Sequence, residues 1–483
     1  MSDYKEYESP FETKYASKEM RYIFSSEKKY STWRKLWVAL AESEMELGLT
    51  QNNKEVITKD MIDEMKAHIY DINYTIALEY EKKFHHDVMS HIYAYSKACP
   101  KAAPIIHLGA TSAYVGDNTD IIVMREALLL IKKKLINVIK ILSDFAEKYK
   151  TLETLSYTHF QPAQPTTLGK RATLWLQDFY FDLLDLDYVL SSLKLLGSKG
   201  TTGTQASFIE LFNDKDTPKE LDLKIAKKMG FNDVYPVSGQ TYSRKIDQRV
   251  YNVLSSIAMS STKFSSDIRL LSHLKEVEEP FELTQVGSSA MPYKRNPILS
   301  ERIASLSRYI ISNSLSPMLT ASSQWLERTL DDSANKRIVV SEGFLATDSI
   351  LDLLIYVSKG LIVNEKVIKK NLENELPFMV TENILMDLTK NGGNRQTIHE
   401  EIRKLSLEAS NRIKKEGLDN DLIDRLLSSK VLNISKEKMD EYTSLKKYTG
   451  RAPEQVTEFL NNYIFQVLES NKDLIGIDVK VER

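Results

Sequence analysis

The chain of 483 residues contains one cysteine, Cys99, which excludes a disulfide framework within one chain and a cysteine-rich zinc site. Such sparse cysteine is typical of a reducing compartment, so we expect a cytoplasmic protein. Glycine and proline are also scarce, with 17 and 13 residues, whereas leucine, isoleucine, lysine and glutamate are abundant. This composition favours helices over sheets.

Long apolar runs and net charge are missing as well. No uninterrupted apolar run reaches the ~18 residues that a membrane span needs, and residues 1–10 lack the apolar core of a signal peptide. The formal net charge is −2, which argues against a dedicated nucleic-acid-binding protein. We therefore expect neither a membrane nor a nucleic acid as a partner.

Three common cofactor and catalytic motifs are absent too. The sequence has no Gly-x-x-x-x-Gly-Lys, no Gly-x-Gly-x-x-Gly and no Gly-x-Ser-x-Gly. Bound ATP, nicotinamide cofactors and ordinary serine hydrolysis accordingly lose support. We expect no cofactor.

Five segments place apolar residues at the three- and four-residue spacing of long helices. They cover about residues 118–149, 168–196, 241–274, a stretch after Pro297, and 333–359. A helix of about thirty residues is ~45 Å long, and helices of that length are typical of a bundle. The last of the five is apolar on most faces, which indicates burial either between subunits or in the core of one domain.

Loops at residues 107–117 and 361–366 suggest two domain boundaries. We predict an all-α fold with an N-terminal helical domain at 1–111, a central long-helix bundle at 112–364 and a C-terminal helical domain at 365–483.

The segment from Gly287 to Pro297, Gly-Ser-Ser-Ala-Met-Pro-Tyr-Lys-Arg-Asn-Pro, cannot be regular because glycine and proline interrupt it. Asn296 can cap a helix that starts at Pro297, so the loop leads into a helix N-terminus, where negative charge is favoured. Ser288, Lys294 and Asn296 in such a loop suit an anionic substrate and a serine that must lose its proton. The alternative is a surface loop before a well-capped helix.

A second motif, Thr158 to Pro165, holds His159 next to a hydroxyl and close to prolines, which fix the backbone. Histidine titrates near neutrality and is the usual general acid or base, although an isolated histidine in a turn is more often structural. In a third motif, residues 107–118, Thr111 and Ser112 can donate hydrogen bonds to a carboxylate; the alternative is a capping turn.

Adjacent His85 and His86 precede Asp87. Neighbouring residues do not share a helix face, and no His-Glu-x-x-His spacing exists, so we expect no metal site at this fourth motif.

In a fifth motif, residues 327–337, Ser333 and Arg337 share a helix face and Arg328 can approach from the preceding turn. A hydroxyl and guanidinium groups at a helix start suit a phosphate, whereas the alternative is a solvated charged face.

Together these motifs resemble the fumarase/aspartase superfamily of lyases, and the form Met-Pro-Tyr-Lys-Arg-Asn-Pro resembles its adenylosuccinate lyase branch. The similarity runs from about Tyr15 to beyond residues 451–453. It implies a three-domain fold whose long helices form a homotetramer core, with three subunits building each site. It also implies elimination of fumarate from adenylosuccinate to give AMP, and from the related succinyl-carboxamide ribotide of purine biosynthesis.

The resemblance assigns roles by position. It implies that Ser288 is the general base and His159 the general acid, with Lys294 and Asn296 holding the dianion and Glu301 pairing with the histidine. It further implies that the substrate is bound by Lys14, Tyr15, His85, His86, Asp87, Thr111, Ser112, Thr158, Gln240, Arg302, Arg328, Ser333 and Arg337. Lys14 and His85 stand where the resembled enzymes carry arginine, and lysine keeps the charge but loses the bidentate fork.

Three other hypotheses stay open. Another fumarate-releasing lyase is the nearest, but Arg328, Ser333 and Arg337 would have no phosphate to bind in its substrate. A catalytically silent helical scaffold is opposed by the intact Ser288 and His159. A nucleic-acid binder with lysine-rich helices conflicts with the near-neutral charge.

Overall fold

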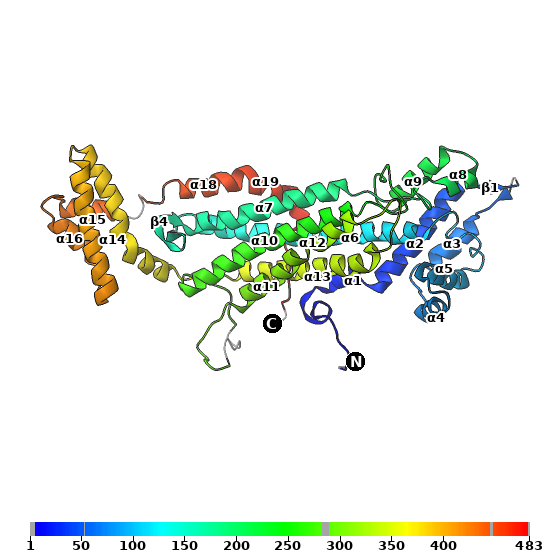
Figure 1. Ribbon diagram of the computed structural model, residues 1–483, viewed down its shortest axis with the longest axis horizontal. Helices are drawn as coiled ribbons and strands as arrows, with labels where there is room; N and C mark the ends of the chain where they lie inside the picture. Colours follow the sequence, from blue (N-terminus) through cyan, green and yellow to red (C-terminus); the bar gives the residue numbers. More distant parts are fainter. Residues whose placement is uncertain (1–4, 53, 283–288, 445–447, 482–483) are drawn as a thin grey trace.

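The structure is a computed structural model that describes residues 5–52, 54–282, 289–444 and 448–481. Ser288, the predicted base, therefore lies outside the described residues. The molecule is elongated, and a bundle of long helices occupies its middle (Figure 1).

Five helices form this bundle: α6 (Ser112–Lys148), α7 (Leu168–Ser192), α10 (Lys245–His273), α11 (Ile298–Asn313) and α13 (Asp332–Lys359). Each packs on the next in that order, and α13 closes the ring on α6. α6 has 37 residues and is thus ~55 Å long. The five predicted long helices are confirmed, but α6 starts six residues early and runs through Gly116, because packing in the bundle overrides the low helix propensity of glycine.

The second half of α13 is buried inside the single chain. Phe344, Ile350 and Leu354 are fully buried there. Gly343 lets Tyr251 of α10 approach, since a Cβ at residue 343 would lie 2.5 Å from that ring. Within one chain this half of α13 is therefore a core helix, and large exposed apolar side chains occur instead on α7, α10 and the short α12 (Leu315–Ser322).

One end of the bundle carries the N-terminal helices and two helices that follow α7 (Figure 1). Trp33 and Trp37 of α2 are buried at this end. The elements at this end are α2 (Ser26–Glu46), β1 (Thr50–Gln51), β2 (Lys54–Glu55), α3 (Lys59–Ala67), α4 (Tyr74–Phe84), α5 (Asp87–Ala98), α8 (Ala206–Phe212) and α9 (Thr217–Lys228). The π-helical turn η1 (Phe11–Tyr15) and α1 (Lys18–Ile23) precede them and pack on α13.

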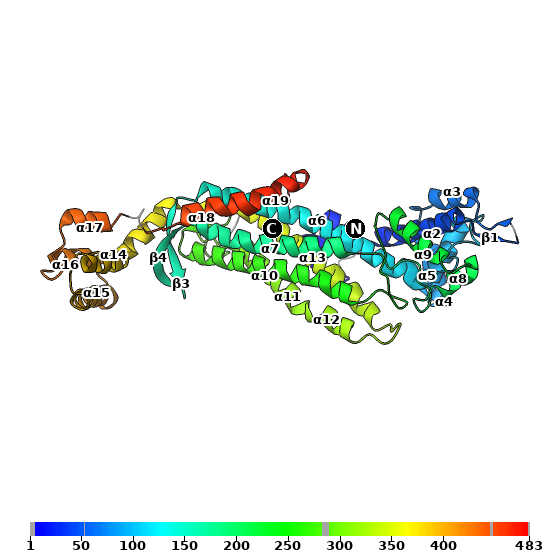
Figure 2. The same ribbon diagram turned by 90° about the horizontal axis from the view of Figure 1, so that it is seen from above.

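The other end carries a separate helical group with its own core, in which Val380, Ile384 and Leu426 are fully buried. Its elements are α14 (Glu365–Lys390), α15 (Arg395–Glu416), α16 (Leu422–Ser428) and α17 (Lys436–Tyr442). The chain then returns, so that α18 (Ala452–Phe459), η3 (Leu460–Ile464), α19 (Phe465–Ser470) and η4 (Lys472–Leu474) follow, with α18 packed on α7 (Figure 2). The three-domain division stays a prediction.

Strands are few and short. β3 (Glu153–Thr158) and β4 (Gln161–Thr167) form an antiparallel hairpin, and β5 (Val277–Glu278) pairs with β6 (Ile362–Val363). No helix in the described part of the chain is long and apolar enough to cross a membrane.

Candidate active site

The joint between α4 and α5 carries the two adjacent histidines. His85 ends α4 in the left-handed conformation with φ 54°, and His86 begins α5 as its cap, its Nδ1 accepting from the Met89 N–H at 3.3 Å. The neutral His86 ring then carries its proton on Nε2, which lies 3.3 Å from the Ser112 hydroxyl oxygen. His86 is therefore the histidine of this pair that faces the start of α6.

Asp87, the first residue of α5, faces the start of α13. Its carboxylate lies 3.6 Å from the guanidinium of Arg337. Thr111 caps the other contributing helix, α6, next to Ser112. The structure therefore brings together His86, Asp87, Ser112 and Arg337, from three helices, and we call these four residues the α5 cluster. No group of three or more histidine, cysteine or acidic side chains suited to a metal occurs in residues 5–52, 54–282, 289–444 and 448–481.

A buried chain of ion pairs lies under the start of α13. Arg328 donates to Asp332 at 2.9 Å, and Asp332 also accepts from Arg244 at 2.6 Å. Arg244 in turn donates two hydrogen bonds to Asp117, at 3.0 and 3.1 Å. Burial opposes the charge on Asp332, but Arg244 and Arg328 outweigh it and lower the pKa of Asp332.

This network was not predicted from the sequence, where the stretch around Gln240 gave only an amide for the substrate. The backbone N–H of Gln240 donates to the Glu327 carbonyl at 3.0 Å. A Cβ at Gly239 would lie 2.4 Å from the same carbonyl oxygen, so only glycine permits this approach. Gln240 and Arg328 are thereby held close together at one end of α13, where Ser333 occupies the first turn.

A second group of predicted residues lies farther along α13. Tyr15, Lys14 and Arg302 line one cavity of about 20 Å³, with the Arg302 guanidinium 5.5 Å from the Tyr15 ring centre. Ser349 of α13 lines it too. Ser349 is twelve residues beyond Arg337, which is ~18 Å along the helix. The residues assigned to the phosphate therefore form two separate groups on one chain.

His159 occupies the tip of the β3–β4 hairpin. Thr158 pairs with Gln161, so the turn consists of His159 and Phe160, with φ 54° and 57°. Two consecutive left-handed residues are typical of a type I′ turn, which normally carries asparagine and glycine. Bulky residues in this conformation cost roughly 1–2 kcal/mol each, and such strain is often found at functional sites.

The strained tip of the hairpin is exposed, whereas hydrogen bonds hold its two strands to neighbouring elements. Arg171 donates to the Leu155 carbonyl at 2.6 Å, and Gln164 donates to Glu382 of α14 at 2.8 Å. The hairpin lies beside α14, at the opposite end of the bundle from α5 (Figures 1 and 2). One chain therefore does not bring His159 to the α5 cluster.

The described part of the predicted catalytic loop projects from the side of the bundle (Figure 1). Lys294 is exposed and Asn296 half-buried. α11 begins at Ile298 rather than at Pro297. Its N-cap residue is Pro297 and not the predicted Asn296, and the Pro297 side chain accepts no hydrogen bond. The first amides of α11 are instead bonded to a resident carboxylate, Glu279, which the sequence did not identify.

Glu301 lies exposed on the first turn of α11. Within the described ranges, no hydrogen bond or ion pair joins Glu301 to His159.

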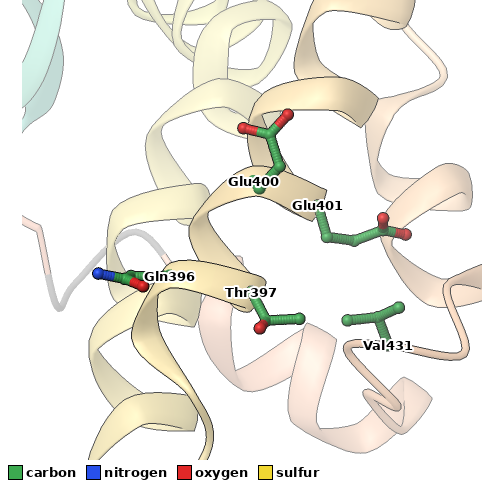
Figure 3. Close-up of a pocket in the computed structure, with 5 residues that line it drawn as sticks. All are labelled: Gln396, Thr397, Glu400, Glu401 and Val431. Carbon is green, nitrogen blue, oxygen red and sulfur yellow. The ribbon is translucent and has the colours of Figure 1, made fainter.

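A hollow of about 430 Å³ lies elsewhere, on the C-terminal helical group (Figure 3). Two of its acidic lining residues already have partners, since Glu400 accepts from Arg403 and Glu401 from Ser429. It contains none of the predicted site residues.

Comparisons with known proteins match nearly the whole chain. A family model described as "Lyase" matches residues 12–312, and one described as "Adenylosuccinate lyase C-terminus" matches residues 377–459. The chain is 48% identical over 478 residues to an adenylosuccinate lyase of Schizosaccharomyces pombe, covering 98% of each chain. It is 48% identical over 472 residues to that of Saccharomyces cerevisiae, covering 97% of each, and 45% identical over 484 residues to that of Schistosoma mansoni, covering 100% of each.

Solved structures confirm the predicted all-α fold of the fumarase/aspartase type. The fumarate lyase from Mesorhizobium sp. BNC1 superposes with a TM-score of 0.78 at 22% identity, covering 94% of this chain and 99% of that one. The 3-carboxy-cis,cis-muconate lactonizing enzyme from Pseudomonas putida superposes with a TM-score of 0.80 at 20% identity, covering 96% and 99%.

Proposed function

The chain belongs to the adenylosuccinate lyases, a family of carbon–nitrogen lyases, and we propose that copies of it combine to build each site around adenylosuccinate. The reaction is the elimination of fumarate to give AMP. We extend the proposal to the succinyl-carboxamide ribotide of purine biosynthesis, whose leaving group is also a nitrogen. The α5 cluster is the observation that carries the proposal, because it joins predicted substrate-binding residues from three helices.

The elimination needs a base for a weakly acidic carbon. We assign it to Ser288, which becomes a sufficient base only if its hydroxyl is desolvated and faces positive charge. Lys294 follows in the same loop and supplies that charge. Lys294 and Asn296 would also hold the dianion that forms when the proton leaves, a contribution of several kcal/mol.

The departing nitrogen needs a proton, which we assign to His159. General acid catalysis of this kind contributes roughly 10²–10⁴-fold. The strained and exposed hairpin tip supports the assignment, because it holds the imidazole away from its own chain. Glu301 of another copy would pair with His159 and fix its tautomer, and Thr158 beside it would contact substrate.

The remaining residues would bind the two anionic ends of the substrate. Thr111 and Ser112 would donate to the dicarboxylate, with His86 and Asp87 beside them, His85 at the rim, and Gln240 and Arg302 as further contacts. Arg328, Ser333 and Arg337, together with Tyr15 and Lys14, would hold the phosphate. Arg337 lies ~18 Å along α13 from Ser349, which lines the cavity of Tyr15 and Lys14, so the two sets would meet on one phosphate only if different copies supply them.

We propose a homotetramer for this reason. Exposed apolar side chains on the bundle support it, since monomeric proteins rarely expose contiguous apolar patches. Leu184 and Tyr188 of α7 are 46% and 67% exposed. Leu326 is 99% exposed and has φ 44°, a conformation that leucine rarely adopts without tertiary support. We also propose the domain division 1–111, 112–364 and 365–483, and a cytoplasmic location, in keeping with the buried free thiol of Cys99.

The test is turnover of adenylosuccinate, followed by its ultraviolet absorbance and by fumarate release, with argininosuccinate as the control substrate. We expect cleavage of adenylosuccinate alone. Mixing two inactive variants, Ser288→Ala and His159→Asn, under conditions that exchange subunits should restore part of the activity. Restoration requires that the two residues of one site come from different copies, so its absence would refute the shared site.

A further inference from the structure

The C-terminal segment 475–481 runs as an anchored strap along the bundle. Residues 475, 477, 479 and 481 are apolar and pack on the core, whereas the residues between them are glycine, aspartate and lysine. This alternation is typical of an extended segment with one face buried. Asn137 of α6 fixes its start, because its side chain accepts from the Gly476 N–H at 2.8 Å and donates to the Leu474 carbonyl at 2.8 Å.

The strap ends at the cavity that Lys14, Tyr15 and Arg302 line. Lys480 and Val481 line the same cavity. It has room for about one water, so a phosphate would lie at its mouth, where lysine side chains reach. Lys480 and Val481 are thereby placed beside Lys14 and Tyr15 of η1 and Arg302 of α11.

The cavity has an excess of positive charge. Asp352 is a carboxylate that lines it, and Lys134 lies 2.7 Å from that carboxylate. In the part of the chain that the structure describes, neither Lys14 nor Lys480 forms an ion pair. Two lysines without a carboxylate partner and the guanidinium of Arg302 around one opening suit an anionic ligand.

We propose that Lys480 is a further substrate-binding residue, which donates to the nucleotide phosphate together with Lys14. The inference rests on the proposed function, which places the phosphate at Tyr15 and Lys14. A lysine at position 14 lacks the bidentate fork of the arginine found in the resembled enzymes. A second ammonium group from the strap replaces the missing donor, since a phosphate has three oxygens to satisfy.

The test uses the full-length enzyme and the variant Lys480→Ala. We expect the KM for adenylosuccinate to rise about fivefold and kcat to stay within about twofold, because the lost contact is present in both ground and transition states. The KM for the same substrate without its phosphate, the nucleoside, should not change. Lys480→Arg should keep the wild-type KM, and the effect of Lys480→Ala should shrink at high salt.

Lys472→Ala is the matched control, because Lys472 belongs to the same C-terminal region but pairs with Glu469 at 2.8 Å. It should leave KM unchanged. If the wild-type enzyme does not cleave adenylosuccinate, the proposed function fails. If the wild-type enzyme is active and Lys480→Ala keeps its KM, or weakens the nucleotide and the nucleoside equally, only the role of Lys480 is refuted.

Discussion

Glu279 and Ser300 are joined by two hydrogen bonds. The Glu279 carboxylate accepts from the backbone N–H of Ser300 at 2.8 Å and from its hydroxyl at 2.9 Å. Its other oxygen accepts from the Leu299 N–H at 3.0 Å. A carboxylate at a helix N-terminus is favourable, and here it ties the chain before the predicted catalytic loop to the helix after it.

Glu279→Ala should therefore destabilise the protein and lower kcat. The buried N–H groups of α11 would lose their acceptor, which costs about 1–3 kcal/mol in the free energy of unfolding. Lys294 and Asn296 lie in the loop that leads into the same helix, so their positions should become less fixed as well. Urea unfolding and turnover measure the two effects, with Glu278→Ala as the control. A stable variant with full kcat would contradict this function of Glu279.

Arg244→Met should be among the most damaging changes outside the catalytic residues. It leaves the buried carboxylates of Asp117 and Asp332 without their shared partner, a loss of about 3–5 kcal/mol in unfolding free energy. Arg328, which Asp332 positions, should then bind the substrate less well. Arg249→Met is the control from the nearby first turns of α10, because Arg249 donates to the Ser192 hydroxyl at 3.1 Å and forms no ion pair within the described residues. Equal stability of the two variants would refute the network.

His107 should make the protein less stable in mild acid. Burial lowers the pKa of His107 to about 4, and its Nδ1 accepts from the Trp37 indole at 2.9 Å, which requires the neutral ring. The unfolded chain binds a proton near the ordinary histidine pKa, so it takes up more protons than the folded chain between about pH 6.5 and 4.

The stability from His107 is thus complete above about pH 6.5 and falls as the pH drops towards 4, by about 2 kcal/mol at pH 5. His107→Asn should flatten this dependence, because asparagine keeps an acceptor and tolerates the left-handed backbone at φ 69°. Urea unfolding at pH 7.5 and pH 5 measures the difference. An equal loss in both proteins would show that other groups cause it.

His159→Asn should lower kcat by roughly 10²–10⁴-fold while the substrate still binds. Asparagine suits the type I′ turn, so the hairpin should keep its shape. Phe160→Asn is the matched control in the same turn, and it should retain most of the activity. If Phe160→Asn is as inactive as His159→Asn, the shape of the turn matters rather than the imidazole. Binding of AMP by calorimetry separates affinity from turnover.

Leu184→Glu should weaken the assembly. A charge on this exposed face of α7 would have to be buried in a subunit interface, and unpaired buried charges are strongly unfavourable. Light scattering should show smaller species, and specific activity should fall on dilution. Leu407→Glu is the control, because Leu407 is similarly exposed, at 50%, on the C-terminal helical group. Identical behaviour of both variants would argue against α7 as an interface.

The sequence predicted the bundle well because periodicity reports burial along one helix. It also identified His86, Asp87, Ser112 and Arg337, which the fold then brought together. It missed Glu279, Arg244 and Asp332, since single charged residues look the same in sequence whether they are solvated or paired across the fold. The hairpin around His159 was missed too, because a turn of histidine and phenylalanine carries none of the usual turn residues.

The rod-like α13 has one further consequence. Its first turns carry Arg337 and its middle lines the Tyr15 cavity, so one rigid helix takes part in more than one catalytic centre of the proposed tetramer. A mutant subunit would then inactivate catalytic centres that it shares with wild-type subunits. In a cell that makes both the wild-type and the mutant chain, the fractional loss of activity should exceed the fraction of mutant subunits.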